Sequence, residues 1–153
     1  MIDGVRVIPL VRQVDDRGYL MEILRSDDEH FIRFGQIYVT TCDPQPSGPT
    51  IKAWHRHEEQ TDYFCCIAGK VKVGLYDGRE GSPTRGETDT VILGGGHDVL
   101  LVIPPGVWHG QTALGFEMSY LINIPTEVYD REDPDEQRAR WDAFPFTWEV
   151  ESR

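Results

Sequence analysis

An all-β barrel of short strands, with one short helix near the C-terminus, is the fold class that the sequence predicts. Short apolar runs recur along the chain, and turn-forming residues separate them at intervals of about ten residues, a spacing typical of sandwiches and barrels. Polar and apolar residues alternate in Lys70–Tyr76, which places Val71, Val73 and Leu75 on one face of a strand. The length of 153 residues suits one domain with one core, which we expect to span residues 1–153.

The expected strands follow one another along the chain. They are Val5–Val11, Leu20–Leu24, Gly35–Thr41, Ile51–His57, Tyr63–Ala68, Lys70–Tyr76, Val91–Leu93, Val99–Ile103 and Met118–Ile124. A turn at Asp15-Asp16-Arg17-Gly18 separates the first two strands. Asp133–Trp141 favours a helix, because Asp133 can act as its N-cap and Pro134 suits the first helical position.

The composition excludes some classes of partner. The chain carries 15 Lys and Arg against 26 Asp and Glu, which gives a net charge of -11. It therefore lacks the basic surface that a protein needs to bind nucleic acids or anionic membranes. A small anionic ligand is still compatible, since a few cations in a pocket can hold it. No apolar run reaches the roughly 20 residues of a membrane span, no signal peptide is evident, and three cysteines show no disulfide framework. We therefore expect a cytoplasmic protein.

Histidines occur in two short motifs. His55 and His57 lie two residues apart on one expected strand, so their side chains face the same side. The segment His55–Gly69 fits H-x-H-x(3,4)-E-x(6)-G with Asp62 in place of Glu, and Pro104–His109 fits P-x-G-x-x-H. These motifs resemble those of the cupin superfamily, which implies a jelly-roll barrel, also called a double-stranded β-helix. Neighbouring strands of such a barrel bring alternate side chains into one interior.

Longer blocks of sequence carry a more specific resemblance. They are Asp16–Glu22, Phe34–Gln36, Lys52–His55, Ser82–Gly86, Ile103–Gly110, Glu117–Tyr120, Trp141–Asp142 and Phe146–Trp148. In order and spacing these blocks resemble the dTDP-4-dehydrorhamnose 3,5-epimerase family, from about Val11 to Trp148. The resemblance implies an isomerase that moves protons next to the ketone of a dTDP-4-keto-6-deoxyhexose without a cofactor.

The resemblance also implies roles for individual residues. His55 falls where the family has its base, Tyr120 where it has its acid, and His109 where a residue stabilises the enolate oxygen. Contacts with the nucleotide and sugar are implied for Arg17, Glu22, Gln36, Lys52 and His57. The N-terminal strand that carries Arg17 and Glu22 is exchanged between subunits in relatives, so a homodimer is implied.

The strand position of Tyr120 predicts where its side chain lies. Tyr120 has the same parity as Met118 and Ile122, so we expect it to face the barrel interior. The alternative is a core tyrosine whose hydroxyl is hydrogen-bonded.

Several positions depart from the family pattern. His57 stands where the family usually has Gln, and Asp62 stands where it has Lys, which reverses the charge. Lys52 stands where the family usually has Arg, and it lacks the bidentate fork of a guanidinium. The C-terminal aspartate that orients the base in relatives has no counterpart here, so Glu58, Glu59 or Asp62 are the candidates to replace it.

Three functions stay open at this point. The favoured one is a metal-free 3,5-epimerase or 3-epimerase, or a related 3,4-ketoisomerase. The second is a metal-dependent cupin, an oxygenase or isomerase, with Fe, Mn, Ni or Zn held by His55, His57, Asp62 and His109. The third is a non-catalytic sugar-binding cupin, suggested by the missing aspartate.

Overall fold

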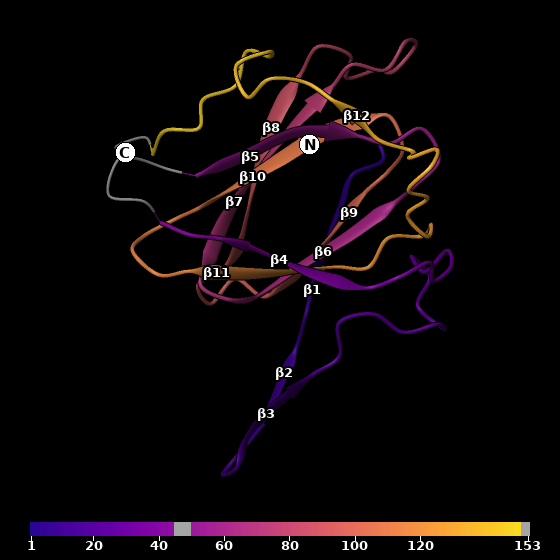
Figure 1. Ribbon diagram of the computed structural model, residues 1–153. Helices are drawn as coiled ribbons and strands as arrows, with labels where there is room; N and C mark the ends of the chain where they lie inside the picture. The colour runs from indigo at the N-terminus through magenta and orange to yellow at the C-terminus, as the bar shows by residue number, and fades with distance from the viewer. Residues whose placement is uncertain (45–49, 151–153) are drawn as a thin grey trace.

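Two five-stranded sheets and a separate hairpin make up the computed structural model, which describes residues 1–44 and 50–150 (Figure 1). The first sheet has the order β1 (Arg6–Pro9), β9 (Val99–Ile103), β6 (Asp62–Ala68), β11 (Ser119–Asn123) and β4 (Tyr38–Cys42). The second has the order β12 (Gln137–Arg138), β5 (Ile51–Arg56), β10 (Val107–Ala113), β7 (Lys70–Asp77) and β8 (Thr88–Gly94). The hairpin joins β2 (Arg12–Asp15) to β3 (Gly18–Met21). This is the jelly-roll barrel that the motifs predict.

The main core lies between the two sheets. Val71, Val73 and Leu75 of β7 are each 0% exposed, which confirms the predicted apolar face of that strand. They meet inward residues of the first sheet, among them Phe64 and Leu101. Each such side chain contributes about 2 kcal/mol when it leaves water, so this alternation stabilises the closed barrel.

A second apolar cluster covers the outer face of the first sheet. Tyr63 and Cys65 of β6 and Leu100 of β9 are buried there, against N-terminal residues that include Ile8 and Met21. Strands β6 and β9 are therefore buried on both faces, which explains why their sequences read as continuous apolar runs. Within the described chain the three cysteines are free and buried.

Aromatic residues near the C-terminus cover the outer face of the second sheet. Trp54 of β5 is completely buried, and its ring lies 4.9 Å from that of Trp148 and 5.4 Å from that of Phe146. The indole N–H groups of Trp54 and Trp148 both donate to the carbonyl oxygen of Trp141. These contacts hold the C-terminal segment against β5.

The helix predicted for Asp133–Trp141 is wrong. The segment is extended, and its Gln137–Arg138 form β12 beside β5. Because Trp141 is the only large apolar side chain in Asp133–Trp141, the segment has no apolar stripe to bury as a helix. Its backbone bonds to β5 instead, since Ala139 and Trp54 exchange both of their backbone hydrogen bonds, at 2.9 and 3.1 Å. In the described residues, no helix is long and apolar enough to cross a membrane.

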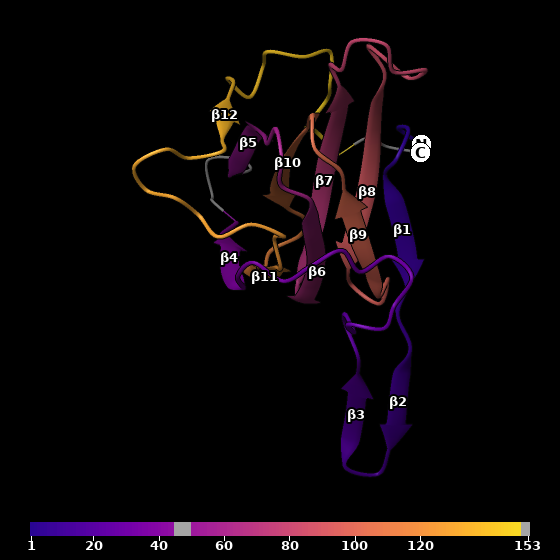
Figure 2. The same cartoon turned by 90° about the vertical axis from the view of Figure 1, so that its right-hand side faces the viewer.

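The hairpin β2–β3 stands away from both sheets (Figures 1 and 2). Its apolar side chains face solvent, with Val14 73% and Leu20 60% exposed. Arg17 lies at its tip and forms an ion pair with Asp15. The hairpin therefore carries apolar surface that its own barrel does not cover.

Candidate active site

A cavity of about 560 Å³ opens between the two sheets and carries the three motif histidines on its wall. His55, His57 and His109 line it, as predicted from their spacing, together with the predicted Gln36 and Lys52. A volume of this size lies within the range of small-molecule sites. The motifs distant in sequence thus meet in one place.

Two strands position the first pair of rings. His55 of β5 and His109 of β10 are direct partners in an antiparallel ladder, and their ring centroids lie 6.4 Å apart. The next residue of β10 is Gly110, where an added Cβ would lie 2.2 Å from the Cβ of Ala53. Glycine therefore lets β5 and β10 approach closely enough to bring the two imidazoles to the same wall.

His55 has a carboxylate partner. Its Nδ1 lies 2.8 Å from Oε1 of Glu136, whose other oxygen, Oε2, accepts hydrogen bonds from Nε and Nη2 of Arg138 at 3.0 and 2.7 Å. Burial raises the pKa of Glu136, but the bonds from Arg138 and His55 outweigh it, so that the net pKa lies below the ordinary value. Glu136 is therefore ionised, and an ionised carboxylate can only accept the hydrogen bond that joins it to Nδ1 of His55.

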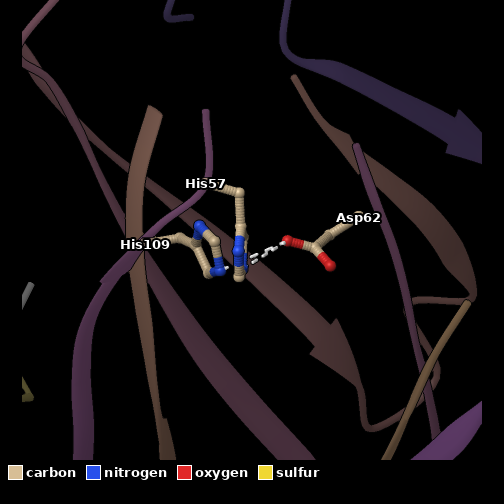
Figure 3. Close-up of side chains that lie close together, drawn as sticks. All are labelled: His57, Asp62 and His109. Atoms are coloured by element: carbon tan, nitrogen blue, oxygen red, sulfur yellow. Dashed lines mark ion pairs between the residues drawn. The ribbon is translucent and has the colours of Figure 1, made fainter. Parts of the chain in front are cut away.

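The buried carboxylate of Asp62 points toward the rings of both His57 and His109 (Figure 3). Its Oδ2 is 3.5 Å from Nε2 of His57 and 3.5 Å from Nε2 of His109, and this oxygen is buried without a hydrogen-bond donor. Its Oδ1 accepts hydrogen bonds from Gln60 Nε2 at 2.8 Å and Asn123 Nδ2 at 2.7 Å. Asp62 is thus held within the first sheet, because β6 carries the carboxylate and the neighbouring strand β11 carries Asn123.

The second nitrogens of these two rings contact backbone carbonyl oxygens. Nδ1 of His57 lies against the carbonyl of Asp135, and Nδ1 of His109 lies 3.2 Å from that of Val107. Burial lowers the pKa of His109 to about 4, against the opposing effect of Asp62, so the ring is neutral at physiological pH. A carbonyl oxygen only accepts, so each ring donates through Nδ1, and Nε2 of each ring faces Oδ2 of Asp62.

Cationic side chains also line the cavity. Nζ of Lys52 donates to the backbone carbonyl of Thr41, and Arg138 is paired with Glu136. Arg131 lies on the same wall, in the segment that follows β11. Three cations in one cavity of an acidic protein suit an anionic ligand.

Three of the predicted site residues lie elsewhere. Tyr120 is 39% exposed on β11, where Ser119, Leu121 and Asn123 are the buried residues, so the predicted inward parity of Tyr120 is wrong. Ile122 packs into the second apolar cluster, because β11 buries apolar side chains on its outer face as well. Because both faces of β11 carry apolar residues, the alternation of residues along this strand did not indicate which face points toward the cavity.

Arg17 and Glu22 do not line the cavity of their own chain. Arg17 lies at the hairpin tip with its side chain 85% exposed, and Glu22 pairs with Arg25 at 2.8 Å. In the described chain, Glu58 forms an ion pair with Arg56, and neither Glu58 nor Glu59 contacts His55. In the described residues, the carboxylate that contacts His55 is that of Glu136, a residue that the sequence did not single out.

Other residues of the cavity also escaped the sequence analysis. Six of them are Tyr38, Asn123, Tyr129, Arg131, Glu136 and Arg138. Four of the six lie between residues 129 and 138, and the wrongly predicted helix at Asp133–Trp141 concealed that Glu136 and Arg138 face the cavity. The Glu-x-Arg pair at 136 and 138 was the available signal, since alternate residues of an extended segment face the same side.

A jelly-roll barrel with histidines converging on an interior cavity defines a cupin-type protein. The family model described as dTDP-4-dehydrorhamnose 3,5-epimerase matches residues 1–152, and the chain belongs to that family. This places it among the nucleotide-sugar epimerases, which are isomerases.

Curated relatives and a solved structure agree with this assignment. A probable low-salt glycan biosynthesis epimerase of Haloferax volcanii is 46% identical, covering 92% of this chain and 89% of its own. The spore coat polysaccharide biosynthesis protein SpsL of Bacillus subtilis is 41% identical over 100% of both chains. The crystal structure of a dTDP sugar isomerase from Desulfovibrio desulfuricans superimposes with a TM-score of 0.88 at 35% identity, covering 96% of this chain and 92% of the other.

Proposed function

We propose that the enzyme epimerises a dTDP-4-keto-6-deoxyhexose at a carbon atom next to the ketone, with His55 as the base. The observation that carries this proposal is the pairing of His55 Nδ1 with Glu136 on the wall of a cavity of about 560 Å³. A ketone acidifies the adjacent C–H bonds, and a neutral imidazole has the basicity to remove such a proton near neutral pH. No metal is required for this step.

A tyrosine of the cavity is proposed to return the proton on the opposite face of the sugar. Tyr38 and Tyr129 line the cavity, whereas Tyr120 lies outside it. The hydroxyl of Tyr38 accepts a hydrogen bond from Asn123, and burial first and Asp62 second raise its pKa to about 12. A weaker acid is a poorer proton donor. We therefore assign the acid to Tyr129 in place of Tyr120.

His109 is proposed to lie at the reacting end of the substrate. Its ladder pairing with His55 places the two rings on one wall. Because its ring is neutral, it contributes shape and polarity there rather than a positive charge.

The nucleotide diphosphate is proposed to meet the cavity cations. Lys52, Arg131 and Arg138 supply positive charge, and Gln36 and His57 supply polar contacts on the same wall. Charge-assisted bonds to phosphate are about twice as strong as neutral hydrogen bonds. This charge supports a nucleotide sugar rather than a free sugar as the ligand.

A homodimer with exchanged hairpins is proposed to complete the site. The hairpin carries exposed apolar side chains, and β4 is an edge strand whose Val39 is 53% exposed. The hairpin β2–β3 stands away from the barrel (Figure 1), and neither Arg17 nor Glu22 lines the cavity of its own chain, so these residues would reach a substrate from a second copy. Covering the apolar hairpin would also remove it from water.

The cytoplasm is the proposed location. Three free cysteines, all buried, suit a reducing compartment.

Deuterium exchange at the carbons next to the ketone tests the proposed reaction. In heavy water the enzyme should incorporate deuterium into a dTDP-4-keto-6-deoxyhexose and yield the 3-epimer or the 3,5-epimer, while His55→Ala should abolish incorporation. A 3,4-keto product would instead assign the related ketoisomerase reaction. Tight binding of the nucleotide sugar without any exchange would point to a sugar-binding protein and refute catalysis.

One observation favours a second candidate function, a metal-dependent enzyme. The Nε2 atoms of His57 and His109 and Oδ2 of Asp62, which has no hydrogen-bond partner, lie within 4.8 Å of one another, an arrangement that fits a divalent cation. The 3.5 Å separations are long for hydrogen bonds and suit two ligands of one ion. Fe, Mn, Ni or Zn held there would supply a Lewis acid, and His55, the fourth ligand expected from the sequence, does not belong to this group.

Elemental analysis decides between the two candidates. Protein purified without chelator should contain about one equivalent of metal if the second function holds, and His57→Ala should remove it. Full deuterium exchange by metal-free protein would exclude that function.

A further inference from the structure

We infer that Glu136 is the positioning residue that fixes the ring of His55 as the tautomer with a free Nε2. This inference deepens the proposed function, since it rests on His55 acting as the base. Glu136 lies in the segment for which a helix was predicted, and its role corresponds to that of the C-terminal aspartate that orients the base in relatives.

The backbone around Glu136 is anchored to the strand that carries the base. Gln137 and Arg138 of β12 pair with Arg56 and His55 of β5. On the far side of this pair, Ala139 and Trp54 exchange two backbone hydrogen bonds. A carboxylate that precedes such a ladder is held at a fixed distance from the histidine, without the freedom of a surface loop.

The neighbouring residue Asp135 anchors the segment from its other end. Its carboxylate accepts hydrogen bonds from the backbone N–H groups of Glu58, Glu59 and Gln60, at 2.7, 3.0 and 3.0 Å. Its carbonyl oxygen contacts Nδ1 of His57. Residues 135–138 therefore touch both histidines of the H-x-H motif through Nδ1.

Arg138 decides which oxygen Glu136 offers to the histidine. Nε and Nη2 of Arg138 both donate to Oε2, which leaves Oε1 to accept from His55 at 2.8 Å. The carboxylate cannot donate, so the ring proton has to lie on Nδ1. The Nε2 lone pair then faces the cavity, where a base needs it.

The other nearby carboxylates are engaged elsewhere. Glu58 accepts hydrogen bonds from Arg56 and Gln137, and Asp62 accepts them from Gln60 and Asn123. In the part of the chain that the structure describes, Glu136 is the carboxylate that contacts His55. The positioning role therefore has one candidate.

Glu136→Gln provides a sharp test, because Arg138 controls how the new amide turns. Arg138 has only donors, so it binds the amide oxygen and turns the NH₂ group toward His55. The NH₂ group donates, so it requires an unprotonated Nδ1 on His55, and the ring proton then lies on Nε2. With Nε2 protonated, His55 cannot act as the base. We expect the deuterium exchange rate to fall about 100-fold, as it does when a general base loses its working form.

Removing the arginine from the same variant should restore the base in part. In Glu136→Gln/Arg138→Met the amide is free to turn its oxygen toward Nδ1, so exchange should rise about tenfold relative to Glu136→Gln. Arg138→Met by itself serves as the reference, since Arg138 also lines the cavity. Glu58→Gln is the matched acid-to-amide control outside the cavity and should exchange like the wild type.

Nitrogen-15 NMR of the His55 ring reads the tautomer without any substrate. Wild type and Arg138→Met should carry the proton on Nδ1, Glu136→Gln should carry it on Nε2, and the double variant should return it to Nδ1. A wild-type proton on Nε2, or an unchanged tautomer with an unchanged exchange rate in Glu136→Gln, would overturn the inference. If the wild type shows the Nδ1 tautomer but no exchange, the proposed reaction fails while the positioning role stands.

Discussion

His55 and His109 face each other across the ladder between β5 and β10, with their ring centroids 6.4 Å apart. The two residues are 54 positions apart in sequence by their numbering, and the barrel makes them neighbours. The spacing of β5 and β10 therefore controls whether the base and its neighbouring ring can reach one substrate.

Gly110→Ala should separate these two strands. The new Cβ would lie 2.2 Å from the Cβ of Ala53, so the variant should lose about 2 kcal/mol of unfolding free energy and most of its exchange activity. Urea titration and deuterium exchange measure the two losses. Ala53→Gly in the same chain removes the clashing atom and should recover part of both, whereas a double variant no better than Gly110→Ala would contradict the steric explanation.

Tyr129→Phe should uncouple proton removal from inversion. His55 still removes and returns a proton on its own face, so deuterium should enter the recovered substrate while the yield of epimer falls about 100-fold. Nuclear magnetic resonance of the sugar protons distinguishes the two outcomes. Tyr120→Phe is the control outside the cavity, and a loss of inversion in that variant with none in Tyr129→Phe would reverse the assignment.

Two inactive variants should complement each other if the hairpins are exchanged. Arg17→Ala and His55→Ala are each expected to lose activity, yet a mixed dimer contains one cavity with His55 from one chain and Arg17 from the other. Random mixing after reversible unfolding should restore about a quarter of all sites. A mixture that stays inactive while light scattering shows dimers would place Arg17 outside the site.

The Asp77–Arg79 pair should make stability depend on acid pH. Asp77 is 0% exposed, and hydrogen bonds from Arg79 first, and then from Ser82 and Thr84, hold its pKa well below the ordinary value. Because the unfolded chain then binds the proton more readily than the folded one, this stabilisation is complete above the ordinary pKa of about 4 and is lost as the pH falls below it. Urea titrations between pH 7 and pH 3 should show the decline, and Asp77→Asn should flatten it.

Removing the cation from this pair should destabilise the protein at neutral pH. Arg79→Met leaves a buried carboxylate with hydroxyl partners, so we expect a loss of about 2 kcal/mol, reduced because Arg79 is partly exposed. Arg140→Met is the control, since its pair with Asp142 is exposed and screened by solvent, so the substitution should leave stability nearly unchanged. Equal effects of the two substitutions would show that burial does not set the value of the Asp77 pair.

The strand pattern and the histidine motifs were predictable from the sequence because they depend on local periodicity. Val99–Ile103 was predicted with the bounds of β9, and His55, His57 and His109 were predicted to converge. Strand β10 was not predicted, since Val107–Ala113 mixes a histidine, a glycine and polar residues that face the cavity. A strand that lines a polar cavity loses the apolar alternation by which strands are recognised.

The sequence by itself determined the class of fold, the family and the histidine that we propose as the base. Only the tertiary structure decided which side of β11 faces the cavity, which carboxylate meets His55 and where the segment after β11 lies. The physical reason is that these features depend on contacts between residues far apart in the chain. Glu136 reaches His55 across 81 positions through pairing of β12 with β5, and such pairing follows from the packed barrel rather than from local preference.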